Sequence, residues 1–131
     1  DGAASNNRLD VFAEMRLAAL LAKGASGDAT ALPAHAALTA ATLAAARALD
    51  LGDQIGSIVA GKRADLVAVD LGGVETQPVF DPVSHLVYSC GREHVSHVWV
   101  DGVARVAEGK LLGLEPADLA ARAAYWGEKL R

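Results

Sequence analysis

The residues best suited to chemistry stand at the start of the chain, which reads Asp1-Gly-Ala-Ala-Ser5-Asn6-Asn7. A carboxylate followed by small residues and amides is typical of a loop, and the apolar pattern of a helix begins just after it. Such an aspartate can bind a divalent cation or accept a proton from water, or it can simply stabilise a turn. Two interpretations are also open for Ser5, Asn6 and Asn7: they could support a site at Asp1, or they could cap the next helix.

A second group of candidate ligands surrounds Cys90, namely His85, His94 and His97. The spacings Cys90-x3-His94 and His94-x2-His97 do not form the paired signature of a zinc site. Strand alternation would place His97 beside Trp99 and away from Cys90. We therefore expect solvent-facing or hydrogen-bonded histidines rather than a metal centre, and a small buried thiol at Cys90.

Composition excludes several kinds of partner. The 131 residues carry a formal net charge of −4 without a cluster of Lys or Arg, so we expect no nucleic-acid binding. One cysteine cannot form an internal disulfide, which favours a reducing, cytoplasmic compartment. Polar residues interrupt the alanine-rich run over residues 29–51, so no membrane span is expected. Because the sequence begins with Asp rather than Met, we expect a piece of a longer polypeptide.

Two helices must follow the candidate loop. Apolar residues at three- and four-residue spacing predict a helix over residues 9–23, with Asn7 and Asp10 as a capping arrangement and Gly24 as its stop. Pro33 predicts the start of a second helical stretch over residues 34–49, either one helix or two. Its inner side would include Leu49.

The pattern then changes to that of a sheet. Residues 55–59 and 64–71 are predicted to be strands joined by a glycine-centred turn, and the continuous apolar run of the second favours a strand covered on both faces. Residues 95–101 and 103–106 form a hairpin around Asp101-Gly102. Pro116 opens a closing helix, and Trp99 and Trp126 are expected in the core.

Three stretches together resemble the amidohydrolase superfamily, in particular its branch of 5′-methylthioadenosine/S-adenosylhomocysteine deaminases. They are the opening Asp-Gly-Ala-Ala-Ser-Asn-Asn with the Phe-Ala-Glu-Met-Arg helix, the run Ile-Gly-Ser-Ile-Val-Ala-Gly-Lys-Arg-Ala-Asp-Leu-Val, and Asp-Pro-Val-Ser-His-Leu-Val-Tyr with Val-Ser-His-Val-Trp-Val-Asp-Gly. The resemblance covers essentially the whole chain. The middle stretch identifies the superfamily, and the opening stretch indicates the deaminase branch.

The resemblance implies an α/β fold: the C-terminal fragment of a (β/α)8 barrel together with the C-terminal part of a small β-sandwich. Residues 1–51 would end the barrel, residues 52–112 would belong to the composite sandwich, and residues 113–131 would form a closing helix that covers it. Asp1 would be the metal ligand at the end of the eighth strand and the proton shuttle. One divalent metal, with zinc as the expected ion, would activate water for deamination of an adenine nucleoside.

The family's other metal ligands and its catalytic glutamate are absent from this chain, since the region that holds them lies upstream. The implied partners are therefore the N-terminal remainder of the same protein and a small-molecule nucleoside. The fragment alone is expected to be inactive. The alternatives are another aminohydrolase or chlorohydrolase of the branch, or a non-catalytic α+β module, and a homo-oligomer stays open.

Overall fold

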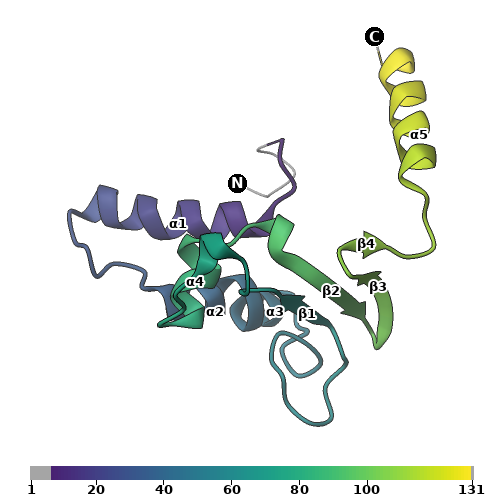
Figure 1. Cartoon of the computed structure of the whole chain (residues 1–131). Coiled ribbons are helices and arrows are strands. Elements are labelled where there is room, and N and C mark those ends of the chain that lie inside the picture. Colours follow the sequence, from purple (N-terminus) through teal and green to yellow (C-terminus); the bar gives the residue numbers. More distant parts are fainter. Residues whose placement is uncertain (1–6, 131) are drawn as a thin grey trace.

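The computed structural model describes residues 7–130, and its elements fall into two groups along the chain (Figure 1). Helices dominate the first part, a four-stranded antiparallel sheet follows, and one more helix ends the described chain. This order agrees with the predicted succession of helices, small sheet and closing helix. None of the described helices is long and apolar enough to cross a membrane.

Helix α1 spans Val11–Ser26 and buries the side that its apolar spacing predicted. Met15 and Ala19 are buried, and Phe12 packs against them. The small alanine lets a neighbouring helix approach closely, while Met15 fills the space beside it.

Both predicted ends of α1 are wrong. The N-cap is Asp10, whose backbone is extended and whose carboxylate accepts a hydrogen bond from the Ala13 amide at 3.2 Å. Asn7 lies three residues before this cap, so it does not cap the helix. Gly24 stays inside the helix, and the chain leaves it at Gly27, where φ is 67°. Glycine adopts this left-handed conformation at little steric cost.

The second helical stretch is continuous but changes pitch. An α-helix, α2 (Ala34–Thr39), runs through a π-helical turn, η1 (Ala40–Ala44), into a short α-helix, α3 (Ala45–Ala48). At this turn the Thr42 hydroxyl donates to the Leu38 carbonyl at 2.7 Å. Back-bonding by threonine competes with the regular backbone pattern, which accounts for the change of pitch.

Alanines form the inner side of this stretch. Ala34, Ala37 and Ala46 are buried, whereas Leu49 is 70% exposed. The prediction that Leu49 lies on the inner side is wrong, because the helix ends at Ala48 and the following residue no longer shares its face.

Residues 55–57 form a bend and residues 58–59 an irregular stretch, in place of the predicted strand. Gly56 adopts φ of 84°, which turns the chain away from an extended path. The Lys62 ammonium donates to the Ile55 carbonyl at 3.2 Å and also to the Gly52 carbonyl. This lysine therefore stabilises the loop from inside.

The sheet has the strand order β1-β2-β3-β4, and all neighbours are antiparallel. Its strands are β1 (Leu66–Val69), β2 (Val95–Val100), β3 (Val103–Ala107) and β4 (Lys110–Leu111). The predicted hairpin at Asp101-Gly102 is confirmed, with φ of 51° and 78° at the two turn residues. Val67 is 56% exposed, so within the described chain β1 is not covered on both faces as predicted.

A crossing segment connects β1 to β2. It contains a 3-10 turn, η2 (Val74–Thr76), the helix α4 (Pro82–Tyr88) and a second 3-10 turn, η3 (Arg92–His94). Asp81 caps α4 by accepting hydrogen bonds from the Val83 and Ser84 amides at 3.1 and 3.3 Å.

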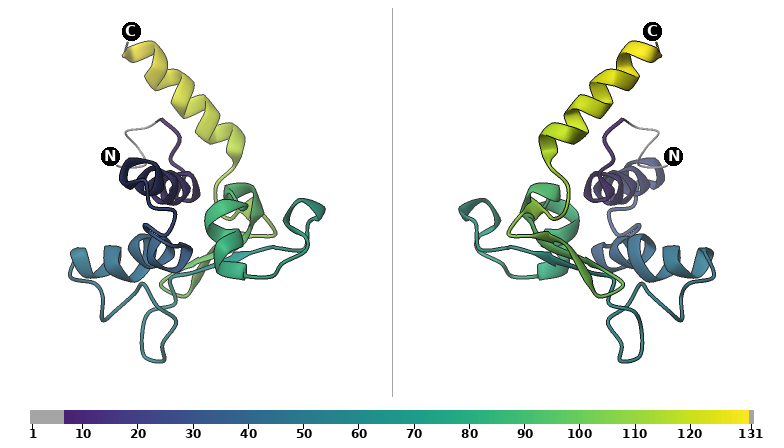
Figure 2. Two further views of the ribbon diagram at one scale, coloured as in Figure 1. Left: turned by 90° about the vertical axis from the view of Figure 1, so that its left-hand side faces the viewer. Right: turned by 90° about the vertical axis from the view of Figure 1, so that its right-hand side faces the viewer.

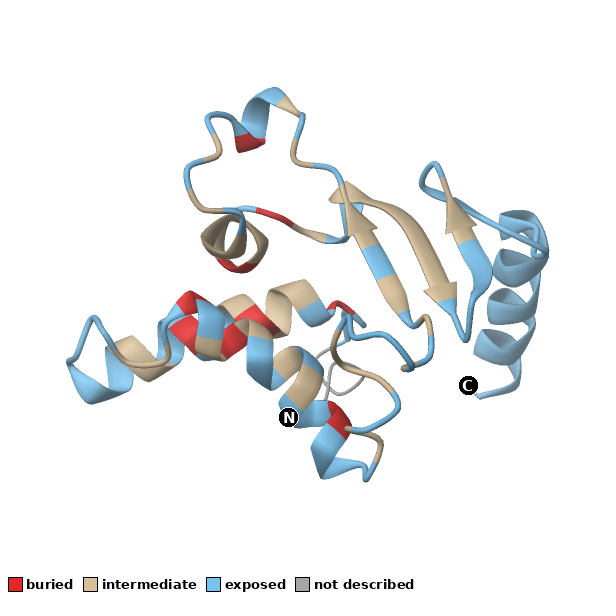
Figure 3. Cartoon of the chain, turned by 90° about the horizontal axis from the view of Figure 1, so that it is seen from below, coloured by how far each residue is buried: buried red, intermediate tan, exposed pale blue. Residues whose placement is uncertain are grey.

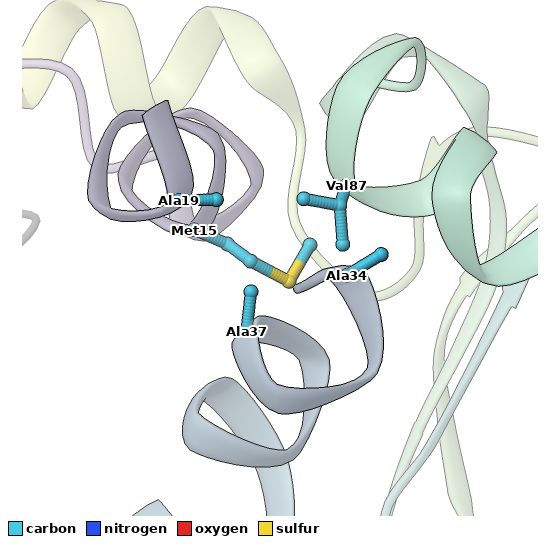
Figure 4. Close-up of a cluster of buried hydrophobic side chains, with 5 residues drawn as sticks. All are labelled: Met15, Ala19, Ala34, Ala37 and Val87. Carbon is cyan, nitrogen blue, oxygen red and sulfur yellow. The ribbon is translucent and has the colours of Figure 1, made fainter. Parts of the chain in front are cut away.

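The hydrophobic core lies between helices and not on the sheet. Met15 and Ala19 of α1 meet Ala34 and Ala37 of α2 and Val87 of α4 (Figure 4). Most of the sheet is only partly covered (Figure 3). The described chain thus provides one layer for its strands and leaves much apolar surface open.

Helix α5 spans Pro116–Lys129 and projects away from the rest of the molecule (Figure 2). All of its residues are exposed, including Trp126 at 57%. The predictions that this helix covers the sheet and that Trp126 lies in the core are therefore wrong for the described chain. The linker over residues 112–115 carries the helix past the edge strand instead of back across the sheet.

Candidate functional site

Of the predicted site residues, Asp1, Ser5 and Asn6 lie outside the described residues. Asn7 is described: it is exposed and adopts φ of 69°. Asparagine tolerates this left-handed conformation better than most residues. Asn7 therefore marks the point where the chain turns out of the candidate loop.

Contacts of Asp10 and Arg92 with Arg8 hold the segment that joins this loop to α1. The Asp10 carboxylate, which is buried, lies 3.4 Å from Nε of Arg8 as well as capping α1. The Arg92 guanidinium, from η3, donates to the Arg8 carbonyl at 3.3 Å. The backbone that follows the candidate loop thus contacts α1 on one side and η3, the turn before β2, on the other.

Arg16 ties α1 to the end of α4. Its Nε donates to the Val87 carbonyl at 3.3 Å, and its Nη2 donates to the Cys90 carbonyl. Sequence reasoning missed this contact, although Arg16 shares the buried side of α1 with Phe12 and Ala19 by spacing. A cation on the buried side of a helix needs nearby hydrogen-bond acceptors. An arginine at such a position is therefore the sequence signal that could have predicted this contact.

Cys90 is buried as predicted. Burial raises the pKa of its thiol, and the positive charge of Arg16 partly opposes that rise. A protonated thiol is a poor nucleophile and a poor metal ligand, so its surroundings favour a packing role.

An acidic hollow of about 460 Å³ lies where the crossing segment meets the ends of β2 and β3. The charged or titratable side chains that line it are Asp70, Glu75, Glu93, His94, His97 and Glu108. Sequence reasoning grouped His94 with Cys90, but Cys90 is not part of this lining. The carboxylates come from distant positions in the sequence, so no local sequence pattern predicts that they lie together.

The His94 side chain is largely buried, with 9% of it exposed. Its Nδ1 accepts a hydrogen bond from the Gly91 amide at 3.1 Å, which puts the proton of the neutral ring on Nε2. Nε2 lies 3.4 Å from the Glu75 carboxylate. His94 therefore acts as an acceptor inside its own turn, and its buried Nε2 faces Glu75 without a hydrogen-bond partner among the described residues. His97 instead stacks on Trp99, with the ring centroids 5.5 Å apart.

A smaller apolar hollow of about 220 Å³ lies between α1 and the second helical stretch, lined by Met15, Leu32 and Ala37 among others. One carboxylate oxygen of Glu14 is buried here with no hydrogen-bond partner among residues 7–130.

The described residues do not by themselves suit a catalytic metal. Among them, no group of three or more His, Cys, Asp or Glu side chains could hold an ion. A zinc site needs three protein ligands and an open position. Asp1 could fill one of these, so the others would have to come from outside this chain.

The sequence matches the amidohydrolase family over residues 1–105, and the chain belongs to that family. It is similar to the 5-methylthioadenosine/S-adenosylhomocysteine deaminases of Teredinibacter turnerae, at 49% identity over 99% of this chain, and of Moorella thermoacetica, at 47% over 93%. The chain spans 29% and 28% of the length of these two relatives.

Solved structures of the family share the fold. An adenosine deaminase from Xanthomonas campestris with bound zinc superposes with a TM-score of 0.95 at 50% identity, over 100% of this chain and 30% of that one. The atrazine chlorohydrolase TrzN from Arthrobacter aurescens, complexed with zinc, superposes with a TM-score of 0.80 at 27% identity, over 87% and 25%. The α/β arrangement of this chain thus corresponds to the C-terminal part of full-length amidohydrolases.

Proposed function

We propose that this chain is the C-terminal part of a zinc-dependent hydrolytic deaminase that acts on adenine nucleosides of the 5′-methylthioadenosine and S-adenosylhomocysteine type. The observation that carries the proposal is the identity of 49% to 50% with two deaminases over nearly the whole chain. Identity with the chlorohydrolase is 27% over 87% of the chain, which makes dehalogenation the weaker candidate.

The proposal includes the arrangement implied by the sequence. Residues 1–51 would end a (β/α)8 barrel, residues 52–112 would form the C-terminal part of a composite β-sandwich, and residues 113–131 would form the closing C-terminal helix. The protein works in the cytoplasm on a small-molecule substrate, and its net charge of −4 argues against nucleic acid as a partner.

Asp1 is the residue of this chain assigned to the chemistry. A divalent metal held jointly by Asp1 and upstream ligands would lower the pKa of water towards neutrality. The Asp1 carboxylate would hold one proton of the attacking water and return it to the departing amine. The bridge formed by Asp10, Arg8 and Arg92 would keep the backbone behind this carboxylate in place.

The test uses the full-length protein loaded with zinc, with ammonia release from 5′-methylthioadenosine as the assay. We expect Asp1→Asn to reduce kcat by about 10²- to 10⁴-fold and to lower the zinc content measured by elemental analysis. Asp118→Asn, the same change on the exposed helix α5, is the matched control and should alter neither. Equal activity of the two variants, or chloride release from atrazine without ammonia release from the nucleoside, would refute the proposal.

Ser5, Asn6 and Asn7 are proposed to support Asp1 or to line the pocket. For Asn7 this is the remaining role, since Asp10 caps α1. Asn7→Gly removes the amide while keeping a residue that accepts φ of 69°. We expect a lower kcat/KM with an unchanged Tm, and a lower Tm with unchanged kinetics would show that the amide has only a structural role.

A further inference from the structure

Helix α5 carries an apolar stripe that nothing in the described chain covers. Leu119, Ala123, Trp126 and Leu130 follow one another at spacings of four, three and four residues, which places them on one side of the helix. All four are exposed, with Trp126 at 57% and Leu130 at 82%. An exposed stripe of this kind on an amphipathic helix marks a surface that is buried in the assembled protein.

The position of α5 is shared with a solved relative and is not peculiar to this chain. The superposition on the Xanthomonas campestris adenosine deaminase includes 100% of this chain at a TM-score of 0.95. Such agreement over all residues leaves no room for a differently placed 14-residue helix. The projecting helix therefore has the same place in a solved chain of which this chain covers only 30%.

The size of the stripe argues against a second copy as its occupant. A helix of 14 residues is about 21 Å long, and one side of it is roughly 10 Å wide. The stripe thus offers on the order of 200 Å², whereas a stable dimer buries about 800 Å² on each partner. A contact within one polypeptide needs far less area, because the covalent link already keeps the two surfaces close.

Helix α1 also leaves an apolar side open in the described chain. Leu17, Leu20 and Leu21 are each more than half exposed, opposite the buried Met15 and Ala19. In Figure 1, α1 lies to the left of the sheet and α5 projects at the upper right. Uncovered apolar sides are thus found on two helices of the described chain.

We propose that α5 is an intramolecular clasp, whose apolar stripe packs against the part of the polypeptide upstream of Asp1 and holds it to this C-terminal part. The inference rests on the proposed function in one respect, namely that the chain belongs to a longer enzyme. It assigns α5 a role different from covering the sheet and different from dimerisation.

The test compares Ala123→Glu with Ala121→Glu in the full-length protein. Both alanines lie in the middle of α5 and are exposed here, but only Ala123 belongs to the stripe. The two variants share the same change in charge, size and helix propensity. We expect Ala123→Glu to lower Tm by at least about 2 °C relative to Ala121→Glu, with the molar mass from light scattering unchanged. Chemical cross-links from Lys129 should reach peptides that precede Asp1.

Three results would overturn the clasp. Equal Tm values would mean that the stripe is uncovered in the full-length protein. A reduced molar mass of Ala123→Glu would mean that a second copy covers it, and cross-links from Lys129 only to strands of this chain would mean that it covers the sheet. If Ala123→Glu lowered Tm relative to Ala121→Glu in a full-length protein that showed no deaminase activity, the clasp would be upheld and the proposed function rejected.

Discussion

Asp10 shows how closely structural and chemical carboxylates can lie along one chain. It is buried, caps α1 and lies beside Arg8, so each of its contacts is local and structural. Asp1, nine positions earlier, is the carboxylate that we propose as a metal ligand. We therefore expect substitution of Asp10 to reduce stability and substitution of Asp1 to reduce activity.

Asp10→Ala should lower the free energy of unfolding of the full-length protein by about 1 kcal/mol, because the orphan amide of Ala13 loses its acceptor. Asp10→Asn keeps a capping oxygen and should retain most of the stability, since an ion pair with the 62% exposed Arg8 contributes little. Urea unfolding measures both variants. Equal losses for Asn and Ala would contradict the capping role.

Cys90 gives a prediction for the dependence of stability on pH. Burial raises the pKa of its thiol in the folded state, so the folded protein holds this proton more tightly than the unfolded chain does. The associated stability is complete below the unfolded pKa of about 8.5 and is lost as the pH rises through the folded pKa. Urea unfolding between pH 7 and pH 10 should show a decline that is smaller in Cys90→Ala. Parallel curves for the two proteins would count against a protonated, buried thiol.

At the scale of elements, the loop after α3 is fitted to the helix that precedes it. A Cβ atom on Gly56 would lie 2.7 Å from Cβ of Ala46 and 2.9 Å from Cα of Leu43. Gly61 has a similar positive φ but open space around it. The comparison of these two glycines separates close packing from backbone conformation.

Gly61→Ala should cost about 1 kcal/mol or more through its left-handed φ of 93°. Gly56→Ala should cost a further 1–3 kcal/mol or so, because the added methyl group must displace the helix. Denaturant midpoints of the full-length variants measure the difference. Equal destabilisation would show that the loop can move away from the helix without loss.

At the scale of the whole molecule, the described chain exposes more apolar surface than we expect of a complete folded unit. The core occupies the junction of three helices, while β1 and α5 present large apolar side chains outward. The chain spans about 30% of the solved deaminase on which it superposes. An upstream body that carries the other ligands would complete both the active site and the missing layer.

The 131-residue chain expressed alone should therefore show no deaminase turnover, even with added zinc, because the described residues hold no group of metal ligands. It should also bind a hydrophobic dye more strongly, per mole, than the full-length protein does, through its open apolar surface. Fluorescence titration and an ammonia assay measure the two effects. Turnover by the isolated chain would disprove the proposed division of ligands.

Short-range patterns were sufficient for several features of this protein. The apolar side of α1, the hairpin at Asp101-Gly102 and the buried Cys90 follow from spacing and residue type, because each depends on neighbours within one or two turns of chain. The family was likewise visible in the motifs, and its match over residues 1–105 confirms it.

Long-range packing decided the rest. The apolar pattern of Trp126 and of Val67 predicts burial, but a pattern does not say which part of a polypeptide will cover it, and in this chain both side chains are more than half exposed. Residues 55–59 form a bend and irregular chain in place of the predicted strand, because Gly56 passes close to Ala46 and Leu43, which are at least ten positions away. Sequence alone therefore determined the local elements and the family. Only the tertiary structure decided which apolar faces meet, because that depends on contacts between residues far apart in the chain.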